Sequence, residues 1–329
     1  MKGTRAIWGR ASRYLIVGRV LLHRYERPIG GSPRDGTRAL WAAYTGRSRP
    51  CRRCPTLPLM VSSLAIVLPA YNEQDRLGTA LDELFAYLCG TPDGGLPELV
   101  TVLVVDDGST DGTVELVRAR SEFVSDAGGA APNHAELRLL EAPHGGKGSA
   151  VRAGILASEA DLIVFADADM ATPPDQLRKL VAALETADVA LGSRIQPDGS
   201  DMRATQPPFR RIVGRIFRLA AQAWVTGPVR DTQCGFKGFR RDAAHDLFGR
   251  LRVTSIVFDV DLIYLARRRG YRIAIVPIVW ADRRGSRMHA RPGLALRVAF
   301  DLVRIRFLHR GVGKVAQGAP AGLEAARRP

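Results

Sequence analysis

Residues 162–169 of this 329-residue chain read Leu-Ile-Val-Phe-Ala-Asp-Ala-Asp, five apolar residues followed by two carboxylates. A short apolar run of this kind is typical of a buried strand. Because side chains alternate along an extended chain, Asp167 and Asp169 point the same way where the strand ends. Two convergent carboxylates suit a hard divalent cation that also holds substrate phosphates, so we predict a metal–diphosphate clamp. The alternative is an ordinary strand end, with Asp169 near the start of a helix suggested by residues 172–175.

Apolar runs and helical periodicities alternate through the chain from residue 61 onward. The runs predict strands at residues 64–68, 100–105, 137–140, 162–166 and 189–192, with Pro69 ending the first one. Helical spacing predicts helices at residues 75–88, 110–120, 148–157 and 175–184. Strands that alternate with helices in this way predict an α/β fold with a doubly wound, parallel sheet.

The net charge of +15 is unevenly distributed. Residues 1–60 contain 13 basic and 2 acidic residues, whereas residues 61–282 contain 24 basic and 29 acidic ones. A basic groove through the folded part is therefore not expected, and nucleic acid is the weaker alternative as a partner. Basic flanks suit an anionic membrane surface instead. We expect residues 1–60 and 311–329 to be disordered, and a chain beginning near Met60 to keep full activity.

Four polar stretches follow predicted strands, at residues 69–73, 106–113, 144–149 and 167–169. Such stretches converge on one edge of an open α/β sheet, where ligands bind. Carboxylates there can accept hydrogen bonds from a base or ribose, and a lysine among glycines at a helix start suits a phosphate. The alternative for part of the second stretch is helix capping. We predict a sugar-nucleotide pocket, with Mg²⁺ or Mn²⁺ on Asp167 and Asp169. The candidate nucleotide ligands are Pro69, Tyr71, Glu73, Asp106, Asp107, Lys147 and Asp167.

Two segments, residues 210–225 and 294–308, interleave arginines with large apolar side chains at helical spacing. Helices of this kind can lie in the headgroup plane of a membrane, although a solvated surface helix is the alternative. The chain has no uncharged apolar run of ~18 residues, the length that predicts a transmembrane helix. We therefore expect peripheral attachment to the cytoplasmic face of a membrane.

The ordered set of motifs at residues 65–73, 104–113, 145–148, 167–169 and 230–237 resembles the inverting GT-A glycosyltransferases of family 2. Within that family, residues 258–264 and 280–287 are similar to dolichyl-phosphate β-glucosyltransferases and their bacterial polyprenyl-phosphate relatives. The resemblance implies a mostly parallel, Rossmann-like GT-A domain at residues 61–293, followed by an amphipathic membrane-interface helix at 294–310. The N-terminal membrane anchor of eukaryotic members is not expected here, which leaves attachment to the basic helices.

The resemblance also implies a reaction: transfer of a hexose, glucose from UDP-glucose, to a polyprenyl monophosphate with inversion. Ala171 favours glucose, because polyprenyl-phosphate mannosyltransferases tend to carry Gln at that position; GDP-mannose or another acceptor remains the alternative. Asp169, Asp259 and Arg194 are the expected catalytic residues, with Asp259 rather than Asp261 facing the reacting centre. Acceptor phosphate or sugar is expected to bind Arg210, Arg211, Asp231 and Gln233, with help from Arg194.

Overall fold

The computed structural model describes residues 61–90, 95–124, 135–205, 208–281 and 292–315. Side chains at 204–213 and 292–296 are not described. The predicted disordered segment at 1–60, residues 316–329 of the one at 311–329, and most of the motif at 280–287 lie outside the described residues. Residues 311–315 are described, and the backbone N–H of Val315 donates to the Arg269 carbonyl, so the prediction of disorder was wrong for these five residues.

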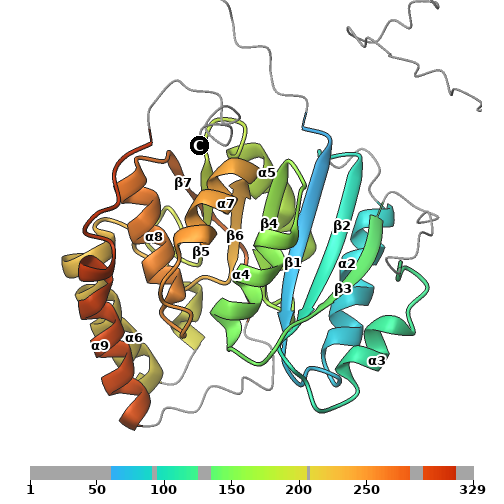
Figure 1. Cartoon of the computed structure of the whole chain (residues 1–329), viewed down its shortest axis with the longest axis horizontal. Helices are drawn as coiled ribbons and strands as arrows, with labels where there is room; N and C mark the ends of the chain where they lie inside the picture. Colours follow the sequence, from blue (N-terminus) through green and yellow to red (C-terminus); the bar gives the residue numbers. More distant parts are fainter. Residues whose placement is uncertain (1–60, 91–94, 125–134, 206–207, 282–291, 316–329) are drawn as a thin grey trace, which may run out of the picture. The chain divides into compact units, whose positions relative to one another are not determined.

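A seven-stranded sheet forms the centre of the described chain (Figure 1), with the strand order β3-β2-β1-β4-β6-β5-β7. The paired strands run parallel except for β6, which is antiparallel to both β4 and β5. The predicted mostly parallel, doubly wound α/β sheet is therefore confirmed. The strands are β1 Ser63–Ala70, β2 Leu99–Asp106, β3 Ala135–Glu141, β4 Leu162–Ala166, β5 Val189–Ser193, β6 Phe236–Arg240 and β7 Ile273–Pro277.

Helices cover both faces of this sheet. They are α2 Leu77–Gly90, α3 Thr113–Arg118, α4 Lys147–Ala157, α5 Leu177–Ala183, α6 Pro208–Ala221, α7 Arg241–Arg250, α8 Phe258–Arg269 and α9 Pro292–Leu308. Short turns are η1 Pro174–Gln176 and η2 Met202–Thr205, both 3₁₀, and a π-helical turn η3 Gln222–Thr226.

Two predicted boundaries were wrong for reasons visible in the structure. Strand β1 continues through Pro69, because its pairing with β4 ends at Val67 and no ladder bond to β4 is lost there. Helix α3 begins at Thr113 rather than residue 110, because the Asp111 carboxylate accepts the backbone N–H groups of Thr113 and Gln74. Those bonds tie the start of α3 to the loop after β1.

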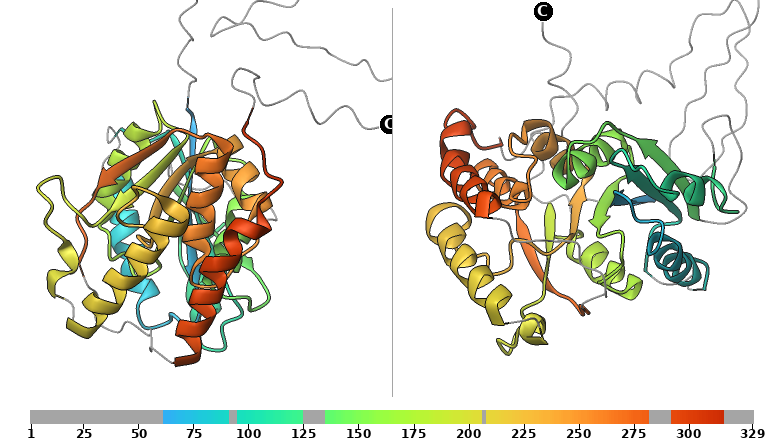
Figure 2. Two further views of the ribbon diagram at one scale, coloured as in Figure 1. Left: turned by 90° about the vertical axis from the view of Figure 1, so that its left-hand side faces the viewer. Right: turned by 90° about the horizontal axis from the view of Figure 1, so that it is seen from below.

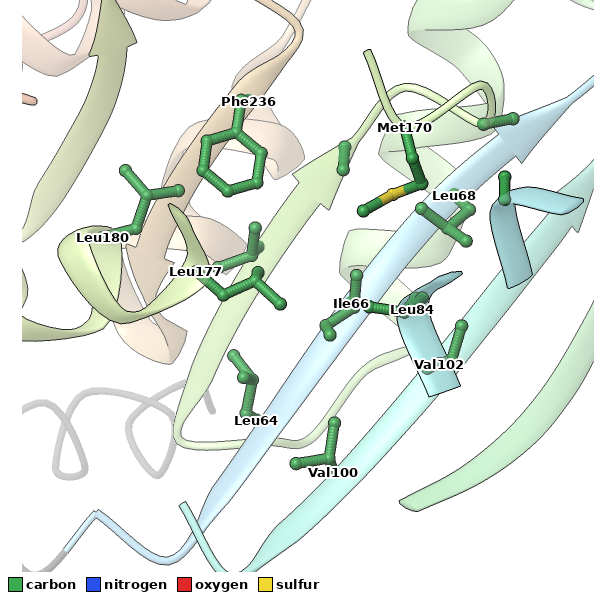
Figure 3. Packing of buried hydrophobic residues seen from close by; sticks show 14 of the residues in the cluster. Leu64, Ile66, Leu68, Leu84, Val100, Val102, Met170, Leu177, Leu180 and Phe236 are labelled. Atoms are coloured by element: carbon green, nitrogen blue, oxygen red, sulfur yellow. The ribbon is translucent and has the colours of Figure 1, made fainter. Parts of the chain in front are cut away.

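Alternating residues of the central strands feed two hydrophobic clusters, one on each face of the sheet. In β1, Leu64, Ile66 and Leu68 belong to the first cluster, and Ala65 and Val67 to the second. Figure 3 shows the first cluster, in which side chains of β1 and β2 pack against α2 and α5. Successive side chains of β1 are thus buried on opposite faces of the sheet, as expected for a sheet covered by helices on both sides.

A third cluster joins η3, α8 and α9 at the side of the sheet, and includes Val225, Val260, Leu302 and Ile305. Helices α6 and α9 lie side by side at this cluster, as Figure 1 and Figure 2 both show. Among the described residues, no helix combines the length and apolarity needed to cross a bilayer.

Candidate active site

The turn after β4 holds the two carboxylates that the sequence singled out. Its backbone closes through a hydrogen bond from Met170 N to the Asp167 carbonyl (2.9 Å), and Ala171 N donates to Asp169 Oδ1 (3.1 Å). Met170 has a left-handed φ of 46°, which is unusual for a bulky residue and costs of order 1–3 kcal/mol. Its buried side chain packs in the core beside Leu68 (Figure 3). Core packing thus holds the strained turn that carries the pair.

Each of these carboxylates faces a cation. Lys147 Nζ, at the start of α4, lies 2.5 Å from Asp167 Oδ1, and Arg76 Nη1 lies 3.6 Å from Asp169 Oδ2. Burial, and then the neighbouring Asp167, raise the pKa of Asp169. Burial alone would lower the pKa of Lys147, but Asp167 and Asp259 raise it above its usual value, so the lysine stays charged.

Gly235 leaves the space in which the Asp167 carboxylate sits. A Cβ atom on Gly235 would lie 2.3 Å from both oxygens of Asp167, so any other residue at 235 would force this carboxylate to move. The glycine of the 230–237 motif therefore allows the carboxylate of the 167–169 motif its present position, although the two are far apart in sequence.

Arg76 is a site residue that the sequence reasoning missed. Its guanidinium binds Glu73 through two hydrogen bonds, Nε to Oε2 (2.8 Å) and Nη2 to Oε1 (2.6 Å). Glu73 is fixed in turn, since its backbone N–H donates to Thr113 Oγ1. The available signal was the spacing of three residues between Glu73 and Arg76, which suits an ion pair at a helix start.

Asp106, at the end of β2, uses its two carboxylate oxygens differently. Its Oδ2 accepts the backbone N–H groups of Gly108 and Ser109, while its buried Oδ1 has no hydrogen-bond partner among the described residues. Asp106 also lines a cavity of about 470 Å³ together with Arg118 and Glu141. A buried acceptor without a donor is costly, and Asp106 borders the cavity, so this carboxyl group is a candidate binding group.

Asp107 instead orders the glycine-rich loop before α4. Its two oxygens accept the backbone N–H groups of Gly145 (2.8 Å) and Gly146 (2.9 Å). His144 Nδ1 lies 2.9 Å from the Asp107 carbonyl, and the imidazole stacks on the half-exposed Tyr71 ring at 4.4 Å. Asp107 therefore acts on the loop in this structure rather than presenting free oxygens to a ligand. Pro69 lies within β1, opposite Val105.

Arg194 and Asp231 form a buried bidentate pair. Arg194 Nε and Nη2 donate to Asp231 Oδ2 (2.9 Å) and Oδ1 (2.7 Å), and Arg203 Nη1 lies 3.6 Å from the same carboxylate. Burial would raise the pKa of Asp231, but the Arg194 guanidinium lowers it to about 2. The guanidinium also lies over the Trp280 ring, 5.6 Å from its centroid. Gln233 is partly buried in the following loop.

Lys237 and Asp259 form a second, fully buried pair. Lys237 Nζ donates to Asp259 Oδ1 at 2.6 Å and to the Cys234 carbonyl. Burial raises the pKa of Asp259 despite this lysine, and Lys147 and Asp167 also act on that carboxyl group. Asp261 lies elsewhere, bound to the backbone of Arg252 and Val253 and to His309. Lys237 was not predicted as a site residue.

Arg210 and Arg211 lie in the first turn of α6, and their side chains are outside the described part of the structure. The structure thus brings Asp167, Asp169, Lys147 and Glu73 together at one edge of the sheet, with Asp259 acting on the same group of charges.

Comparison with known proteins identifies the class. The sequence model described as "Glycosyl transferase family 2" matches residues 65–248, more than half of the chain. The chain therefore belongs to glycosyl transferase family 2, and the resemblance seen in its motifs is confirmed: it is a glycosyltransferase. It is 36% identical to a dolichyl-phosphate β-glucosyltransferase of Trichomonas vaginalis, over 74% of this chain and 71% of the relative.

Other relatives carry the same name. The dolichyl-phosphate β-glucosyltransferases of Dictyostelium discoideum and Homo sapiens are 33% and 32% identical to this chain. These alignments cover 77% and 71% of this chain, and 76% and 73% of the relatives. A solved structure, glucosyl-3-phosphoglycerate synthase from Mycobacterium tuberculosis with UDP, has a TM-score of 0.51 at 19% identity, covering 78% of this chain and 82% of that one. The likeness confirms the predicted GT-A fold.

Proposed function

We propose that this glycosyltransferase transfers glucose from UDP-glucose to the phosphate of a polyprenyl monophosphate such as dolichyl phosphate. Transfer with inversion gives a β-linked lipid-phosphate sugar. The reaction is proposed from relatives of the same name at 32–36% identity. The observation that carries the proposal is the Asp167/Asp169 pair at the end of β4, because the carboxyl ends of strands are where open α/β sheets bind nucleotides.

The base of the donor is assigned to the cavity beside Asp106. The unpartnered Oδ1 of Asp106 is an acceptor, and uracil carries one ring N–H donor. A hydrogen bond from that N–H would satisfy the buried oxygen. Tyr71, stacked on His144, offers an aromatic face at the end of the neighbouring strand β1. The Asp107-bound loop, including Lys147, is assigned to the diphosphate.

The residues present suit a divalent cation, and Asp167 and Asp169 would hold it. Among the described residues, no group of three or more His, Cys, Asp or Glu side chains is gathered for a metal. Two carboxylates completed by substrate phosphates are, however, a common arrangement for Mg²⁺. Gly235 gives the Asp167 carboxylate its space. When bound, the cation would neutralise negative charge that develops on the departing diphosphate.

The acceptor phosphate needs positioning more than activation. A phosphate monoester is already an anion at neutral pH, with a second pKa of about 6, so a strong general base is not required. Arg194 keeps N–H groups beyond those bound to Asp231, and we assign them, with Arg210 and Arg211, to the acceptor phosphate. Asp259, held by Lys237, is assigned an orienting role beside the donor sugar. Gln233 is assigned to the same sugar or phosphate.

The lipid is assigned to a surface formed by α6, η3 and α9, called here the α6–α9 face. In α9, Phe300, Val303 and Phe307 lie on one side of the helix and are 63%, 52% and 48% exposed. From α6 and η3 come the exposed apolar side chains Ile216, Leu219 and Trp224. Arginines border them, with Arg306 over the Trp224 ring and Arg310 over Phe307. Apolar side chains ringed by arginines suit the headgroup region of an anionic membrane, so we propose peripheral attachment to its cytoplasmic face.

A radiolabel transfer assay tests the proposed function. Purified polyprenyl phosphate and Mg²⁺ are offered with labelled UDP-glucose and labelled GDP-mannose in parallel. The expected result is a chloroform-soluble, mild-acid-labile product from UDP-glucose alone. Product from GDP-mannose would overturn the donor assignment, including the argument from Ala171. If neither donor labels lipid while the protein still binds a sugar nucleotide, the acceptor assignment is wrong.

A further inference from the structure

Arg76 and Lys147 each face one carboxylate of the β4 turn, but they are held differently. Lys147 Nζ lies 2.5 Å from Asp167 Oδ1, a direct ion pair, and the two side chains are partly exposed. Arg76 is anchored by Glu73 through Nε and Nη2, which leaves Nη1 directed toward Asp169 at 3.6 Å. That distance is within ion-pair range but longer than a hydrogen bond. Arg76 is therefore held firmly by Glu73 and interacts only weakly with Asp169.

The charges of this cluster nearly cancel. Three carboxylates meet two cations, so the cluster carries a net charge of −1; its members are Glu73, Asp167, Asp169, Arg76 and Lys147. A divalent cation alone would change this charge to +1, and the two charges of a nucleotide-sugar diphosphate alone would change it to −3. Both together restore −1. Close charges in a partly buried site interact strongly, so either ligand alone is disfavoured relative to the pair.

We propose that Arg76 and Lys147 are resident counter-ions of the Asp167/Asp169 pair and couple divalent-cation binding to diphosphate binding. The inference rests on the proposed function, and adds Arg76 as a positioning residue. In the unliganded site the two cations neutralise the carboxylates. When a divalent cation takes those carboxylates, Lys147 Nζ and Arg76 Nη1 lose their partners and turn to the phosphate oxygens of the donor. Because such coupling is reciprocal, the nucleotide must strengthen cation binding as much as the cation strengthens nucleotide binding.

Substitutions of the counter-ions should change the affinities for Mn²⁺ and for UDP-glucose in opposite directions. Arg76→Met and Lys147→Met each remove one positive charge, so Mn²⁺ alone should bind more tightly and UDP-glucose less tightly. Glu73→Gln removes a negative charge from the same cluster, so Mn²⁺ alone should bind less tightly. Damage to the fold would weaken binding in every variant and could not give opposite signs. Lys179→Met, at an exposed lysine of α5, is the matched control.

The experiment is isothermal titration of the full chain with Mn²⁺ and with UDP-glucose, each in the absence and presence of the other and without lipid acceptor. Thermal unfolding of each variant serves as the folding control. In the wild-type protein we expect each ligand to tighten the other about tenfold or more, within the usual range of coupled sites. Arg76→Met and Lys147→Met should tighten Mn²⁺ binding without nucleotide severalfold and weaken UDP-glucose binding. Lys179→Met should change neither.

The outcomes separate the inference from the function. A direct metal–phosphate contact would by itself couple the two ligands, so coupling in the wild-type protein does not prove the counter-ion role. The test of that role is how the variants bind Mn²⁺ without nucleotide. If Arg76→Met and Lys147→Met weaken Mn²⁺ binding without nucleotide, or leave it unchanged, the counter-ion role is wrong although the chain still binds its donor. If UDP-glucose does not bind the wild-type protein even with saturating Mn²⁺, the proposed donor itself is wrong.

Discussion

Two regions of the molecule hold their charges in opposite ways. At the donor edge, defined by Asp106, Lys147, Asp167 and Asp169, one carboxylate oxygen has no partner in the described part of the chain, and the Lys147 and Asp167 side chains are 41% and 37% exposed. In the inner pairs, Arg194–Asp231 and Lys237–Asp259, the charges are buried and bound to each other at 2.6–2.9 Å. The donor edge is arranged to exchange partners with a ligand. The inner pairs are arranged to keep theirs.

This difference has a physical reason. A buried ion pair loses hydration that its mutual attraction only partly returns, so such pairs are weak evidence for stability and are better explained as fixing geometry. Lys237 fixes Asp259 against the Cys234 carbonyl, and Asp231 fixes Arg194 over Trp280. The Lys147–Asp167 pair is only partly buried, so water screens it more than it screens the inner pairs, and it can exchange partners at lower cost.

The largest effect is expected from breaking an inner pair. Lys237→Met leaves the Asp259 carboxylate buried without a counter-ion, so the free energy of unfolding should fall by about 3–5 kcal/mol. Urea unfolding measures it. Lys237→Met combined with Asp259→Leu removes both charges and should recover most of the stability, while transfer activity should stay low. Recovery of activity in this double variant would show that Asp259 is only structural.

At the donor edge, Asp169→Asn should reduce activity strongly and stability very little. The side chain is 25% exposed, so stability should barely change, whereas the transfer rate should fall about 10²–10³-fold, because Asp169 would hold the cation that stabilises the departing diphosphate. Transfer assays at saturating Mg²⁺ give the rate, and Asp175→Asn, at an exposed carboxylate of η1, is the matched control. Near-full activity in Asp169→Asn would contradict the proposed clamp.

The Arg194–Asp231 pair should appear in the pH dependence of stability. The pKa of Asp231 is lowered from its usual 3.8 to about 2 in the folded protein, so the pair stabilises the fold above pH 3.8. By linkage this contribution is about 2 kcal/mol and is lost as the pH falls from about 4 to about 2. The difference in unfolding free energy between the wild type and Asp231→Asn should therefore shrink over that range. A constant difference would show that Asp231 does not titrate with a lowered pKa.

The smallest effect is expected on the α6–α9 face. Phe300→Ser removes one exposed aromatic ring, so binding to anionic liposomes should weaken about tenfold while UDP-glucose binding is unchanged. Cosedimentation with liposomes measures it. Leu99→Ser, at an exposed leucine that begins β2, is the control of similar exposure. Truncation before α9 is a poorer test, because Leu302, Ile305 and His309 of that segment are buried. Equal loss of liposome binding in Phe300→Ser and Leu99→Ser would contradict a specific membrane face.

The donor edge could be predicted from the sequence because it depends on local patterns. Strand β4 matches its predicted bounds, and parallel strands bring their carboxyl ends to one edge whatever the details of packing. The positions of Asp106, Asp167 and Lys147 follow from that rule. The local pattern could not predict which group each carboxylate binds. The Asp107 carboxylate, for example, binds the loop before α4.

The inner pairs could not be predicted because they depend on tertiary contacts. Arg194 and Asp231 are 37 residues apart, and Lys237 and Asp259 are 22 apart. Strand β6 was missed for the same reason: a lysine and a glycine interrupt its apolar pattern, and the lysine is buried only because a carboxylate from α8 meets it. Its antiparallel insertion between β4 and β5 has no local signature.

A crystal structure of the full chain with UDP-glucose and Mn²⁺ tests the contrast between the two regions most directly. We predict Mn²⁺ on Asp167 and Asp169, the base against Asp106 Oδ1, and Lys147 Nζ and Arg76 Nη1 closer to phosphate oxygens than to the aspartates. Arg194–Asp231 and Lys237–Asp259 should keep their present contacts. A complex in which Lys147 still binds Asp167 while Arg194 has left Asp231 to bind the nucleotide would contradict this account.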